Sequence, residues 1–478
     1  MGFILSGFYS VFYIAFFLIA ITLIILERRK PEKTIAWLLL FLVFPPLGIF
    51  LYLFIGRNWK VNKLNDGSNK DLKELVYNAM FEAKVPEYKS LFQLIANNSD
   101  SPLFIDNQVT VFYDGDEKFK ALKKELNGAK HHIHLEYYIV NSDGIGEEIT
   151  EILIRKSLEG VKVRFILDKV GSVRYKRKDV ERLKAAGVDI VYYSYFLAPL
   201  LRFINTQINY RNHRKIAVID GRVGFVGGIN IGDEYLGKAK LGYWRDTHLM
   251  VKGDFVLGLQ SVFLDDYLSI KEVNKEMPIY EDDFSTYFPK PEASKGQALQ
   301  LVKSGPDSAY PSILQAIIKM INMAEDHIYI TTPYFVPPDS IMEALRIAAL
   351  GGIDVSILFP AQADHLSVHL ASKTYLNELI KCGVKVYMYD KNAFIHSKVI
   401  TIDGLIGTVG TANMDIRSYE QNYEVNALIY SKEVTKNLED KFIKDLSKST
   451  LISMDDCIKE PFYLKWAEAI ARVFSYLL

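Results

Sequence analysis

The sequence predicts an α/β protein made of two similar halves that follow an apolar N-terminal segment. Apolar runs of strand length alternate with helical stretches from about residue 60 onward, which is typical of an α/β fold. The same pattern of residues occurs at 212–221 and again at 395–404, and such an internal repeat indicates a duplicated unit. Residues 2–26 and 34–55 contain no charged side chain, which sets the N-terminal segment apart.

Each of the two uncharged runs is long enough to cross a membrane. At about 1.5 Å per helical residue, both exceed the roughly 30 Å of a bilayer's hydrocarbon core. A cleavable signal peptide fits poorly, because no basic region precedes the first run and the run is too long. We therefore expect residues 1–58 to form a two-helix transmembrane hairpin, which makes the chain a multi-pass membrane protein.

The basic residues around this hairpin leave its orientation open. Residues 28–30 hold two arginines and a lysine, which favour a cytoplasmic turn under the positive-inside rule. Arg57, Lys60 and Lys63 follow the second run and favour the opposite orientation.

Composition argues weakly against a nucleic-acid binder. Lysine plus arginine equals aspartate plus glutamate, at 57 each, whereas nucleic-acid binders usually carry a basic excess. The two cysteines, Cys382 and Cys457, fit neither a disulfide framework nor a zinc cluster.

The two halves show the same order of elements. In the first half we expect a strand at 133–136, a helix at 146–158 and a buried strand at 161–167. The second half repeats this order with a helix at 312–324, a strand at 328–330, a helix at 340–350 that Asp339 caps, and a strand at 353–359.

The strongest part of the repeat is a pair of His-x-Lys-x4-Asp motifs. The two copies align without gaps and consist of His213, Lys215 and Asp220, and of His396, Lys398 and Asp403. The same register places Asn230 on Asn413, each after a glycine-containing turn. Alternation along a strand puts the histidine and lysine of each copy on one face.

Two halves that face each other offer two imidazoles, two ammonium groups and two amides. This set suits a phosphodiester: one histidine attacks phosphorus, the other protonates the leaving alkoxide, and lysine and asparagine donors hold the oxygens. A single His-x-Lys on a strand is usually structural. Two copies in a fixed register have no obvious packing value, which favours catalysis.

With these motifs the chain resembles the phospholipase D superfamily, and most closely the bacterial cardiolipin synthases. The N-terminal segment adds to the resemblance through Ala36-Trp37-Leu38-Leu39, Pro46-Leu47-Gly48 and residues 52–57. The resemblance covers essentially the whole chain and implies two α/β sandwich domains related by a pseudo-twofold axis, with the active site at their interface. We place these domains at 59–295 and 296–478.

The resemblance also implies roles for the repeated residues. His213 would be the nucleophile that forms a phosphohistidine, and His396 the general acid and later the base, although the internal symmetry alone does not decide which histidine attacks. The phosphate oxygens would be bound by Lys215, Lys398, Asn230 and Asn413. Asp220 and Asp403 complete the motif and would support the site without touching substrate. No cofactor and no metal is implied.

A carboxylate follows each motif at a similar distance along the chain. An imidazole attacks well only when its far nitrogen is held, and Asp246 and Glu424 are the candidates for this role. We expect each carboxylate to orient the histidine of its own half. The alternative is that Asp246 merely pairs with Arg245.

Other histidines and charged residues suit a structural role better. His131, His132 and His134 cluster before a strand, and His365 and His369 lie four residues apart on an expected helix, a spacing that can bind zinc. No third ligand is evident for the second pair, and Leu366 stands where a metalloprotease helix would carry glutamate. Residues 118–130 are expected to form a charged helix with a solvated face.

Two apolar features suggest contact with lipid. Residues 192–208 are more apolar than a loop, and they either lie at the bilayer and admit acyl chains or form a buried crossover. Pro461 opens a helix whose apolar stripe either lies in the membrane interface or packs on the domain. The stripe consists of Trp466, Ile470, Val473, Phe474 and Leu477.

These expectations point to transfer of a phosphatidyl group between two phosphatidylglycerol molecules, giving cardiolipin and glycerol. The partners would be phosphatidylglycerol and other anionic phospholipids in the membrane, with no nucleic acid, and the oligomeric state is open. The rival interpretations are a hydrolytic phospholipase D, a nuclease-like phosphodiesterase and a non-enzymatic membrane scaffold. A membrane anchor favours transfer, because a lipid acceptor is then close and water is excluded from the intermediate.

Overall fold

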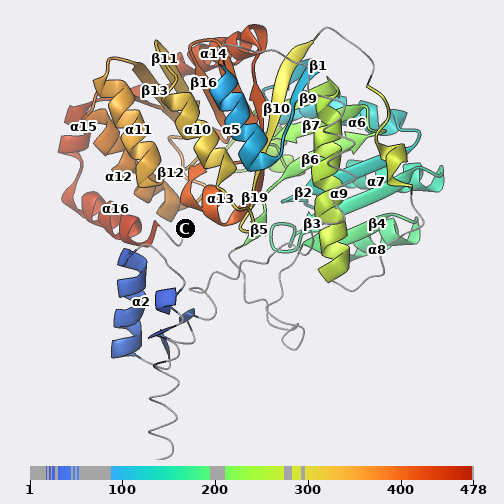
Figure 1. Cartoon of the computed structure of the whole chain (residues 1–478), viewed down its shortest axis with the longest axis horizontal. Helices are drawn as coiled ribbons and strands as arrows, with labels where there is room; N and C mark the ends of the chain where they lie inside the picture. Colours follow the sequence, from blue (N-terminus) through green and yellow to red (C-terminus); the bar gives the residue numbers. More distant parts are fainter. Residues whose placement is uncertain are drawn as a thin grey trace, which may run out of the picture. The chain divides into compact units, whose positions relative to one another are not determined.

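The computed structural model describes residues 88–193, 210–273, 283–291 and 296–475, together with parts of 18–52. The chain divides into two compact units. One comprises Met1–Val61 with Ser194–Tyr210, and the other comprises Asn62–Tyr193 with Arg211–Leu478. The second unit carries both His-x-Lys-x4-Asp motifs (Figure 1).

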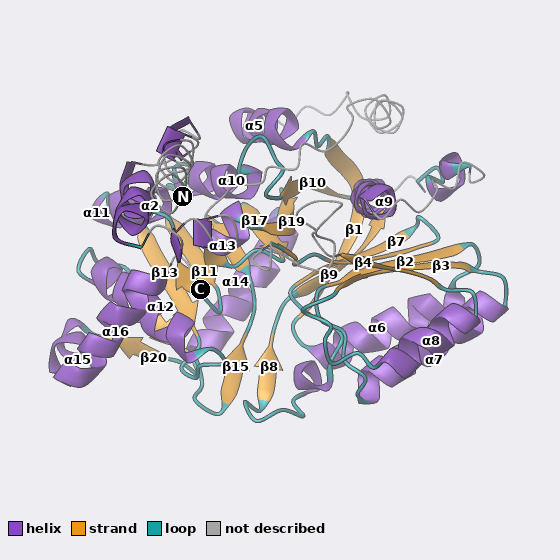
Figure 2. Cartoon of the chain, turned by 90° about the horizontal axis from the view of Figure 1, so that it is seen from below, coloured by secondary structure: helices purple, strands orange, loops and turns teal. Residues whose placement is uncertain are grey.

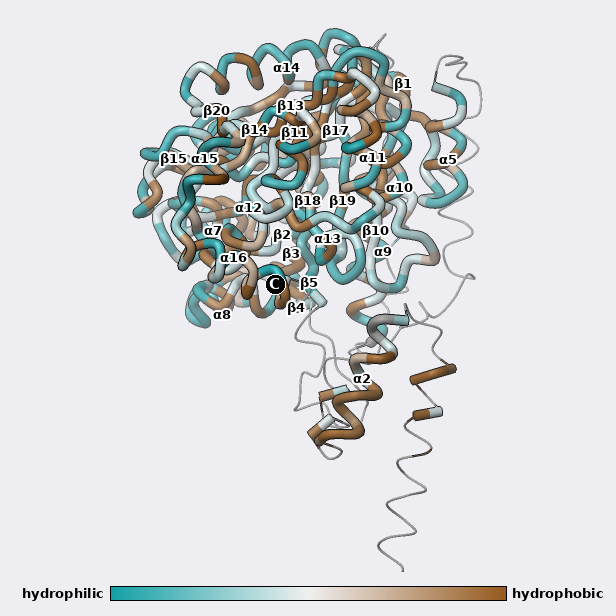
Figure 3. Tube along the Cα trace, turned by 90° about the vertical axis from the view of Figure 1, so that its left-hand side faces the viewer, coloured by the Kyte–Doolittle hydropathy of each residue, from teal (hydrophilic) through white to brown (hydrophobic). Residues whose placement is uncertain are grey.

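The first unit contains the apolar helix α2 (Pro31–Val43), which Figure 3 colours as hydrophobic along most of its length. Trp37 and Phe41 of this helix meet the ring of Tyr52 edge to face, at centroid distances of 5.3 and 5.6 Å. In the part of the chain that the structure describes, no helix has both the length and the apolar content needed to cross a membrane. Much of the predicted hairpin, including most of 2–26, lies outside the described residues.

In the part of the chain that the structure describes, a single sheet of 16 strands runs through both halves of the second unit. Fifteen strands lie side by side in one order, and the sixteenth, β5 (Arg211–Asn212), lies off this order. From the centre outward, the first half contributes β1 (Leu103–Phe112), β9 (His248–Gly253), β7 (Val223–Gly227), β6 (Lys215–Ile219), β2 (His132–Tyr137), β3 (Lys162–Asp168) and β4 (Asp189–Tyr193). In the same outward order, the second half contributes β10 (Gln297–Ser304), β19 (Asn422–Ile429), β17 (Ile406–Gly410), β16 (Val399–Ile402), β11 (His327–Thr331), β13 (Asp354–Phe359), β14 (Lys385–Met388) and β20 (Thr450–Ile452). Apart from β20 the two orders mirror each other, so the duplication seen in the sequence is also a duplication of topology.

Antiparallel pairing of β1 with β10 joins the two half-sheets. Within each half, the motif strand lies antiparallel to the first parallel strand, β6 on β2 and β16 on β11. The registers agree as well, because Ile133 faces Ile219 and Ile328 faces Ile402. The gapless alignment of the two motifs therefore reflects equivalent positions in space.

Helices cover both faces of the sheet in each half. In the first half, one face carries α6 (Gly115–Gly128), α7 (Gly144–Leu158) and α8 (Arg177–Ala185), and the other carries α9 (Phe255–Val273), as Figure 2 shows. In the second half, one face carries α10 (Ser312–Ile321), α11 (Asp339–Leu350) and α12 (Leu366–Ile380), and the other carries α14 (Lys432–Leu446). The chain ends with α15 (Met454–Lys459) and α16 (Phe462–Phe474). Each half is thus an α/β sandwich.

Three local features differ from expectation. Helix α5 (Lys89–Ser99) belongs to the range expected for the first domain, but it packs on α10 and β10 and adds Leu91 and Ile95 to the core of the second half. Asp339 is the first helical residue of α11 rather than its cap, because the extended residue before it is Pro338, which has no side-chain acceptor. Lys118 on α6 is fully buried, although this helix keeps the expected solvated face, on which Glu117 and Lys120 are exposed.

The motif histidines lie at breaks between short strands. In the first half β5 (Arg211–Asn212) ends just before His213, and β6 begins at Lys215. In the second half β15 (Ala393–Ile395) ends just before His396, and β16 begins at Val399. The remaining short elements are β8 (Tyr243–Arg245), β12 (Phe335–Val336), β18 (Met414–Asp415), α13 (Ile416–Glu420), η4 (Asp233–Leu236) and η5 (Phe284–Tyr287).

Candidate active site

Strand exchange between the halves brings the two motifs together. β5 of the first half pairs with β19 of the second, and β15 of the second half pairs with β8 of the first. The backbone N–H of His213 donates to the carbonyl of Tyr423 at 3.0 Å, and that of His396 donates to the carbonyl of Arg245 at 2.8 Å. Each histidine is therefore held by the backbone of the opposite half, and both lie where the halves meet.

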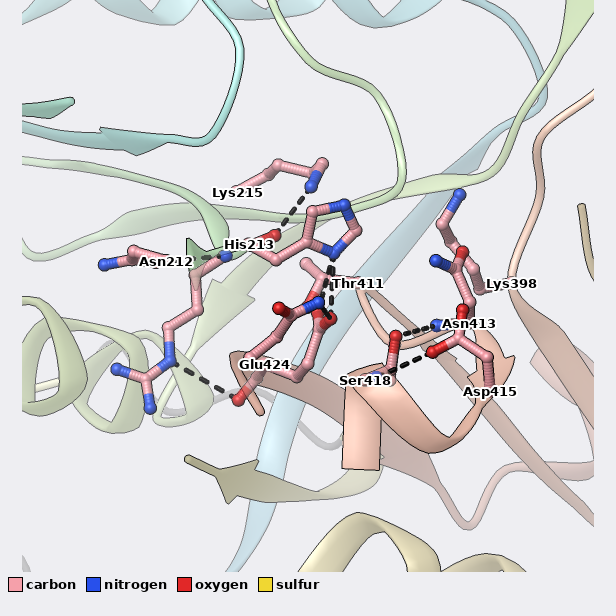
Figure 4. Close-up of polar contacts among 12 residues, drawn as sticks. Asn212, His213, Lys215, Lys398, Thr411, Asn413, Asp415, Ser418 and Glu424 are labelled. Atoms are coloured by element: carbon pink, nitrogen blue, oxygen red, sulfur yellow. Dashed lines mark hydrogen bonds and ion pairs between the residues drawn. The ribbon is translucent and has the colours of Figure 1, made fainter. Parts of the chain in front are cut away.

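The carboxylates orient the histidines across this interface. Nδ1 of His213 lies 2.9 Å from an Oε of Glu424, and Nδ1 of His396 lies 2.7 Å from an Oδ of Asp246 (Figure 4 shows the first pair). An ionised carboxylate only accepts hydrogen bonds, so each imidazole donates from Nδ1 and directs Nε2 away.

The prediction that each carboxylate orients the histidine of its own half is wrong. The pairs are crossed because the short strands are crossed: Glu424 sits on the strand that pairs with β5, and Asp246 directly follows the strand that pairs with β15. The alternative partner for Asp246 is also excluded, since Arg245 binds Asp445 at 2.8 Å and the hydroxyl of Thr247 at 2.8 Å.

Different groups position the two carboxylates. The Thr411 hydroxyl donates to Glu424 at 2.5 Å, and the Asn422 amide donates to it at 3.2 Å. Asp246 accepts from the Thr247 backbone N–H at 2.7 Å and lies against Gly228 so closely that a Cβ there would come within 2.0 Å of its oxygen. Gly228 and Thr411 occupy equivalent places in the repeat, where glycine makes room for one carboxylate and threonine binds the other.

The two motif lysines are buried and fold back toward their own histidines. Nζ of Lys215 donates to the His213 carbonyl at 2.6 Å. Nζ of Lys398 donates to the His396 carbonyl and lies 2.9 and 3.1 Å from the two ring nitrogens.

Burial lowers the pKa of both ammonium groups, and it outweighs the neighbouring carboxylates that raise them. It brings the pKa of Lys215 to about 7 and that of Lys398 to about 8. Lys398 of the second half lowers the pKa of both Lys215 and His213 of the first half through space, so charges from the two halves act on the same site.

Burial also dominates the titration of the histidines. It lowers the pKa of His213 to about 4, although Glu424 opposes this, and Lys215 lowers the pKa further. The pKa of His396 is lowered by burial and by Lys398, while Asp246 raises it. Burial alone raises the pKa of Glu424, but His213 and Lys215 bring it below its usual value. A neutral imidazole beside an ionised carboxylate is the state that favours nucleophilic attack.

The two asparagines differ. The Asn230 side chain accepts from the Ile139 backbone N–H at 3.2 Å and donates to the Tyr235 hydroxyl at 2.6 Å. Asn413 is buried beside Lys398 in Figure 4, and its Oδ1 has no hydrogen-bond partner among the described residues. Buried polar atoms normally find a partner, so the Asn413 amide is available to a ligand. Its Oδ1 can only accept, and its Nδ2, which donates to none of the described residues, is the atom that can bind a phosphate oxygen.

The motif aspartates lie at the far end of the motif strands. Asp220 accepts from the backbone N–H groups of residues 130–132 at 2.8 to 3.0 Å, and Asp403 accepts from those of residues 325–327 at 2.8 to 2.9 Å. Both have a left-handed backbone, with φ of 53°. Their carboxylates bind the motif hairpin to the start of β2 and of β11. They form no hydrogen bond with the motif histidines, His213 and His396.

Sequence reasoning missed the aromatic residues around the histidines. Tyr138 meets His213 edge to face at 4.8 Å. His396 has four rings around it at 5.4 to 6.5 Å, namely Tyr235, Trp244, Tyr334 and Phe394. A tyrosine follows the first parallel strand of each half, and this was the available signal for Tyr138 and Tyr334.

The candidate zinc histidines have other contacts. His132 and His134 both bond the Gln260 side chain, at 3.1 and 3.2 Å, and His134 also meets Arg164 at 3.2 Å. His369 packs on Phe359. Among the described residues, no group of three or more His, Cys, Asp or Glu side chains is arranged to hold a metal. Nearly all of the apolar stretch at 192–208 lies outside the described residues.

Comparison with known proteins agrees with this architecture. The family described as "Cardiolipin synthase, PLD-like domain" matches residues 122–240 and 317–446, and the family described as "Phospholipase_D-nuclease N-terminal" matches residues 14–57. The cardiolipin synthase of Geobacillus kaustophilus is 40% identical over 99% of this chain and 94% of its own length. That of Listeria monocytogenes serotype 4a is 40% identical over 97% of both chains.

A solved structure shares the fold. The phosphatidylserine synthase of Haemophilus influenzae superposes with a TM-score of 0.62 over 82% of this chain and 98% of its own, at 15% identity. At that identity the likeness concerns the fold alone. The identity to the two synthases over nearly the whole chain decides the family: this chain belongs to the cardiolipin synthases of the phospholipase D superfamily.

Proposed function

We propose that this protein is a cardiolipin synthase, which transfers a phosphatidyl group from one phosphatidylglycerol to another and releases glycerol. The observation that carries the proposal is the pair of imidazoles at the junction of the halves, each held through Nδ1 by a carboxylate from the opposite half. A ping-pong transfer needs two such groups, one to attack and one to move protons.

In the first step Nε2 of His213 attacks the phosphorus of the first phosphatidylglycerol. The bond from phosphorus to the oxygen of the headgroup glycerol breaks, and Nε2–H of His396 protonates that oxygen. Free glycerol leaves, and a phosphatidyl-histidine remains. In the second step the glycerol hydroxyl of the second lipid attacks the same phosphorus. His396 takes the hydroxyl proton, the P–N bond breaks, and cardiolipin forms.

The surroundings of the two rings support this division of roles. Among the described residues no hydrogen bond is made to Nε2 of His213, which is free to attack, whereas the Lys398 ammonium lies against both nitrogens of His396 and so hinders attack by that ring. The same ammonium lowers the pKa of His396 in the absence of substrate. Binding of an anionic phosphate raises the pKa of His396 and so favours its protonated form. The roles are a proposal that the resemblance first suggested.

Lys215, Lys398 and Asn413 are the groups we assign to the phosphate oxygens. Their donors develop their strongest interaction as charge builds up on those oxygens in the transition state. Asn230 is already bonded to Tyr235, so we assign it to positioning that ring beside His396. Glu424 and Asp246 are positioning residues, since each acts through its histidine.

We propose that the N-terminal segment anchors the enzyme in the membrane as a two-helix hairpin of residues 1–58. The support is the absence of charge in 2–26 and 34–55, the apolar helix α2, and the family match over residues 14–57. An anchored enzyme keeps its lipid acceptor at high local concentration, which favours transfer over hydrolysis.

Purified protein in phosphatidylglycerol vesicles tests the function. Cardiolipin and glycerol should appear in equal amounts, and the His213→Ala variant should yield neither. Phosphatidic acid as the main product would identify a hydrolase, and DNA cleavage without lipid turnover would identify a nuclease. Turnover of neither lipid nor DNA would favour a non-enzymatic scaffold.

A further inference from the structure

Helix α16 packs on the protein through its polar side. Its buried residues are Glu468 and Ala471, at 3% and 9% exposed. Glu468 pairs with Lys373 of α12 at 2.7 Å, and the Arg472 guanidinium lies 4.3 Å from the centre of the Tyr375 ring. An amphipathic helix that only covers a domain buries its apolar side, so α16 is turned the other way.

The outward side of α16 exposes six large apolar or aromatic residues, which we call the apolar face of α16. They are Phe462, Tyr463, Trp466, Ile470, Val473 and Phe474, with exposures from 48% to 77%. Leu477, which belongs to the predicted stripe, lies outside the described residues. Isolated exposed apolar residues need no explanation, but a contiguous group of this size marks an interaction surface.

The composition of this face suits the interfacial layer of a bilayer. Phe462, Tyr463 and Trp466 gather in the first turns, and aromatic side chains of this kind concentrate at the level of lipid headgroups. Lys459 and Lys465 are exposed beside them, and ammonium groups are attracted to anionic headgroups. The substrate of the proposed reaction, phosphatidylglycerol, is itself an anionic lipid.

Helix α12 connects this face to the active site. Directly before α12, Asp364 accepts a hydrogen bond from Tyr334, whose ring lies 6.5 Å from His396. The first residue of α12, Leu366, is 67% exposed, and α16 contacts the same helix at Lys373 and Tyr375. Seven to nine residues separate these points, or about 10–14 Å along the helix axis. Figures 1 and 3 show α16 beside α12.

We propose that the apolar face of α16 docks into the headgroup layer of an anionic bilayer and holds the active site against the lipid surface. The benefit to the enzyme rests on the proposed function, because only a lipid substrate makes this placement useful. The docking itself is a binding event and is tested without turnover.

A fluorescent label tests docking in the full-length protein reconstituted in vesicles of phosphatidylglycerol and phosphatidylcholine. Cys382 and Cys457 are replaced by serine, and an environment-sensitive dye is attached to cysteine at Val473→Cys or, as control, at Lys178→Cys on α8. The dye at position 473 should shift to the blue and be protected from aqueous iodide, and the dye at position 178 should show neither change. Equal quenching at both positions would overturn the proposal.

A second copy of the chain is the competing occupant of this face. In detergent without vesicles, the quenching of the dye at position 473 should be the same at every protein concentration. Protection that appears without lipid and grows with protein concentration would assign the face to self-association and refute docking into lipid.

Matched variants test the consequence for turnover. Val473→Glu is compared with Leu158→Glu, another exposed apolar residue, 72% exposed at the end of α7. Val473→Glu should lower cardiolipin formation on vesicles about tenfold and leave turnover in detergent micelles unchanged, while Leu158→Glu changes neither. Equal effects of the two variants would contradict the proposal. If the unmodified protein made no cardiolipin, the proposed function would fail, and the dye would still decide the docking.

Discussion

The two halves of the molecule contain the same motif in different surroundings. Among the described residues, the ring that meets His213 is that of Tyr138, and Nε2 of His213 receives no hydrogen bond from them. His396 is enclosed by four aromatic rings and has the Lys398 ammonium against both ring nitrogens. Duplication thus supplies two similar imidazoles, and the residues outside the motif make them unequal. This inequality leaves His213 as the freer nucleophile. Because Lys398 lowers the pKa of His396, that ring becomes a proton donor once an anionic phosphate is bound.

The largest expected effect comes from removing either imidazole. His213→Ala and His396→Ala should each lower cardiolipin formation by about 10³-fold or more, because the steps depend on both groups. A substrate whose leaving group is nitrophenol needs no proton in the first step, so His396→Ala should release nitrophenol in a single burst even though the second step still lacks its base, and His213→Ala should release none. Rates measured on both substrates give the comparison. Equal release by the two variants would show that the halves do not differ in role.

The crossed carboxylates sharpen the same comparison. Asp246→Asn and Glu424→Gln should each lower the rate of cardiolipin formation about 10²-fold, because the imidazole loses its orientation and its correct tautomer. Asp246→Asn should respond to the nitrophenyl substrate as His396→Ala does, and Glu424→Gln as His213→Ala does. The opposite assignment would mean that each carboxylate serves its own half.

The lysines should set the alkaline limit of activity. Lys215 and Lys398 stabilise phosphate only when protonated, and burial lowers their pKa to about 7 and about 8. Their help is complete below pH 7 and is lost as the pH rises through these values, so kcat/KM should fall between about pH 7 and 8. Lys215→Arg should shift this fall in kcat/KM to higher pH, because arginine keeps its charge. An unchanged fall would exclude Lys215 as its cause.

A smaller difference is expected at the equivalent positions 228 and 411. Thr411→Val removes one hydrogen bond to Glu424 and should cost about 10-fold, the equivalent of roughly 1.4 kcal/mol. In Gly228→Ala the new Cβ displaces the Asp246 carboxylate, so this variant should lose activity in the way that Asp246→Asn does. Nitrophenyl substrate should then rescue the first step in Gly228→Ala alone, and rescue of that step in both variants would contradict the separate supports.

The smallest effect on chemistry is expected at the motif aspartates. Asp220→Ala and Asp403→Ala each leave three backbone N–H groups without their acceptor and should cost about 1–3 kcal/mol of stability. Asparagine tolerates the left-handed backbone and should cost less. Denaturant unfolding measures the stability, and kcat at low temperature should stay near that of the unchanged protein. A loss of kcat without a loss of stability would place these residues in the site.

Local sequence patterns predicted the order of strands and helices in each half. Pairing between residues far apart in the sequence determines which carboxylate meets which histidine. The duplicated order of elements followed from periodicity and from the gapless repeat, and the mirrored strand order agrees with it. The crossing of the carboxylates depends on β5 and β15, which have two and three residues. Strands so short carry no periodicity, and their partners lie in the other half of the chain. The aromatic surroundings of His396 converge from several elements, which one sequence does not reveal.

The central claim is that both imidazoles act on one phosphorus atom, and a structure with vanadate tests it most directly. Vanadate adopts the geometry of a phosphoryl group under attack. The account predicts one vanadium bonded to Nε2 of His213, with Nε2 of His396 within hydrogen-bond reach of the opposite apical oxygen. Vanadium held by one histidine while the other lies out of reach would contradict it.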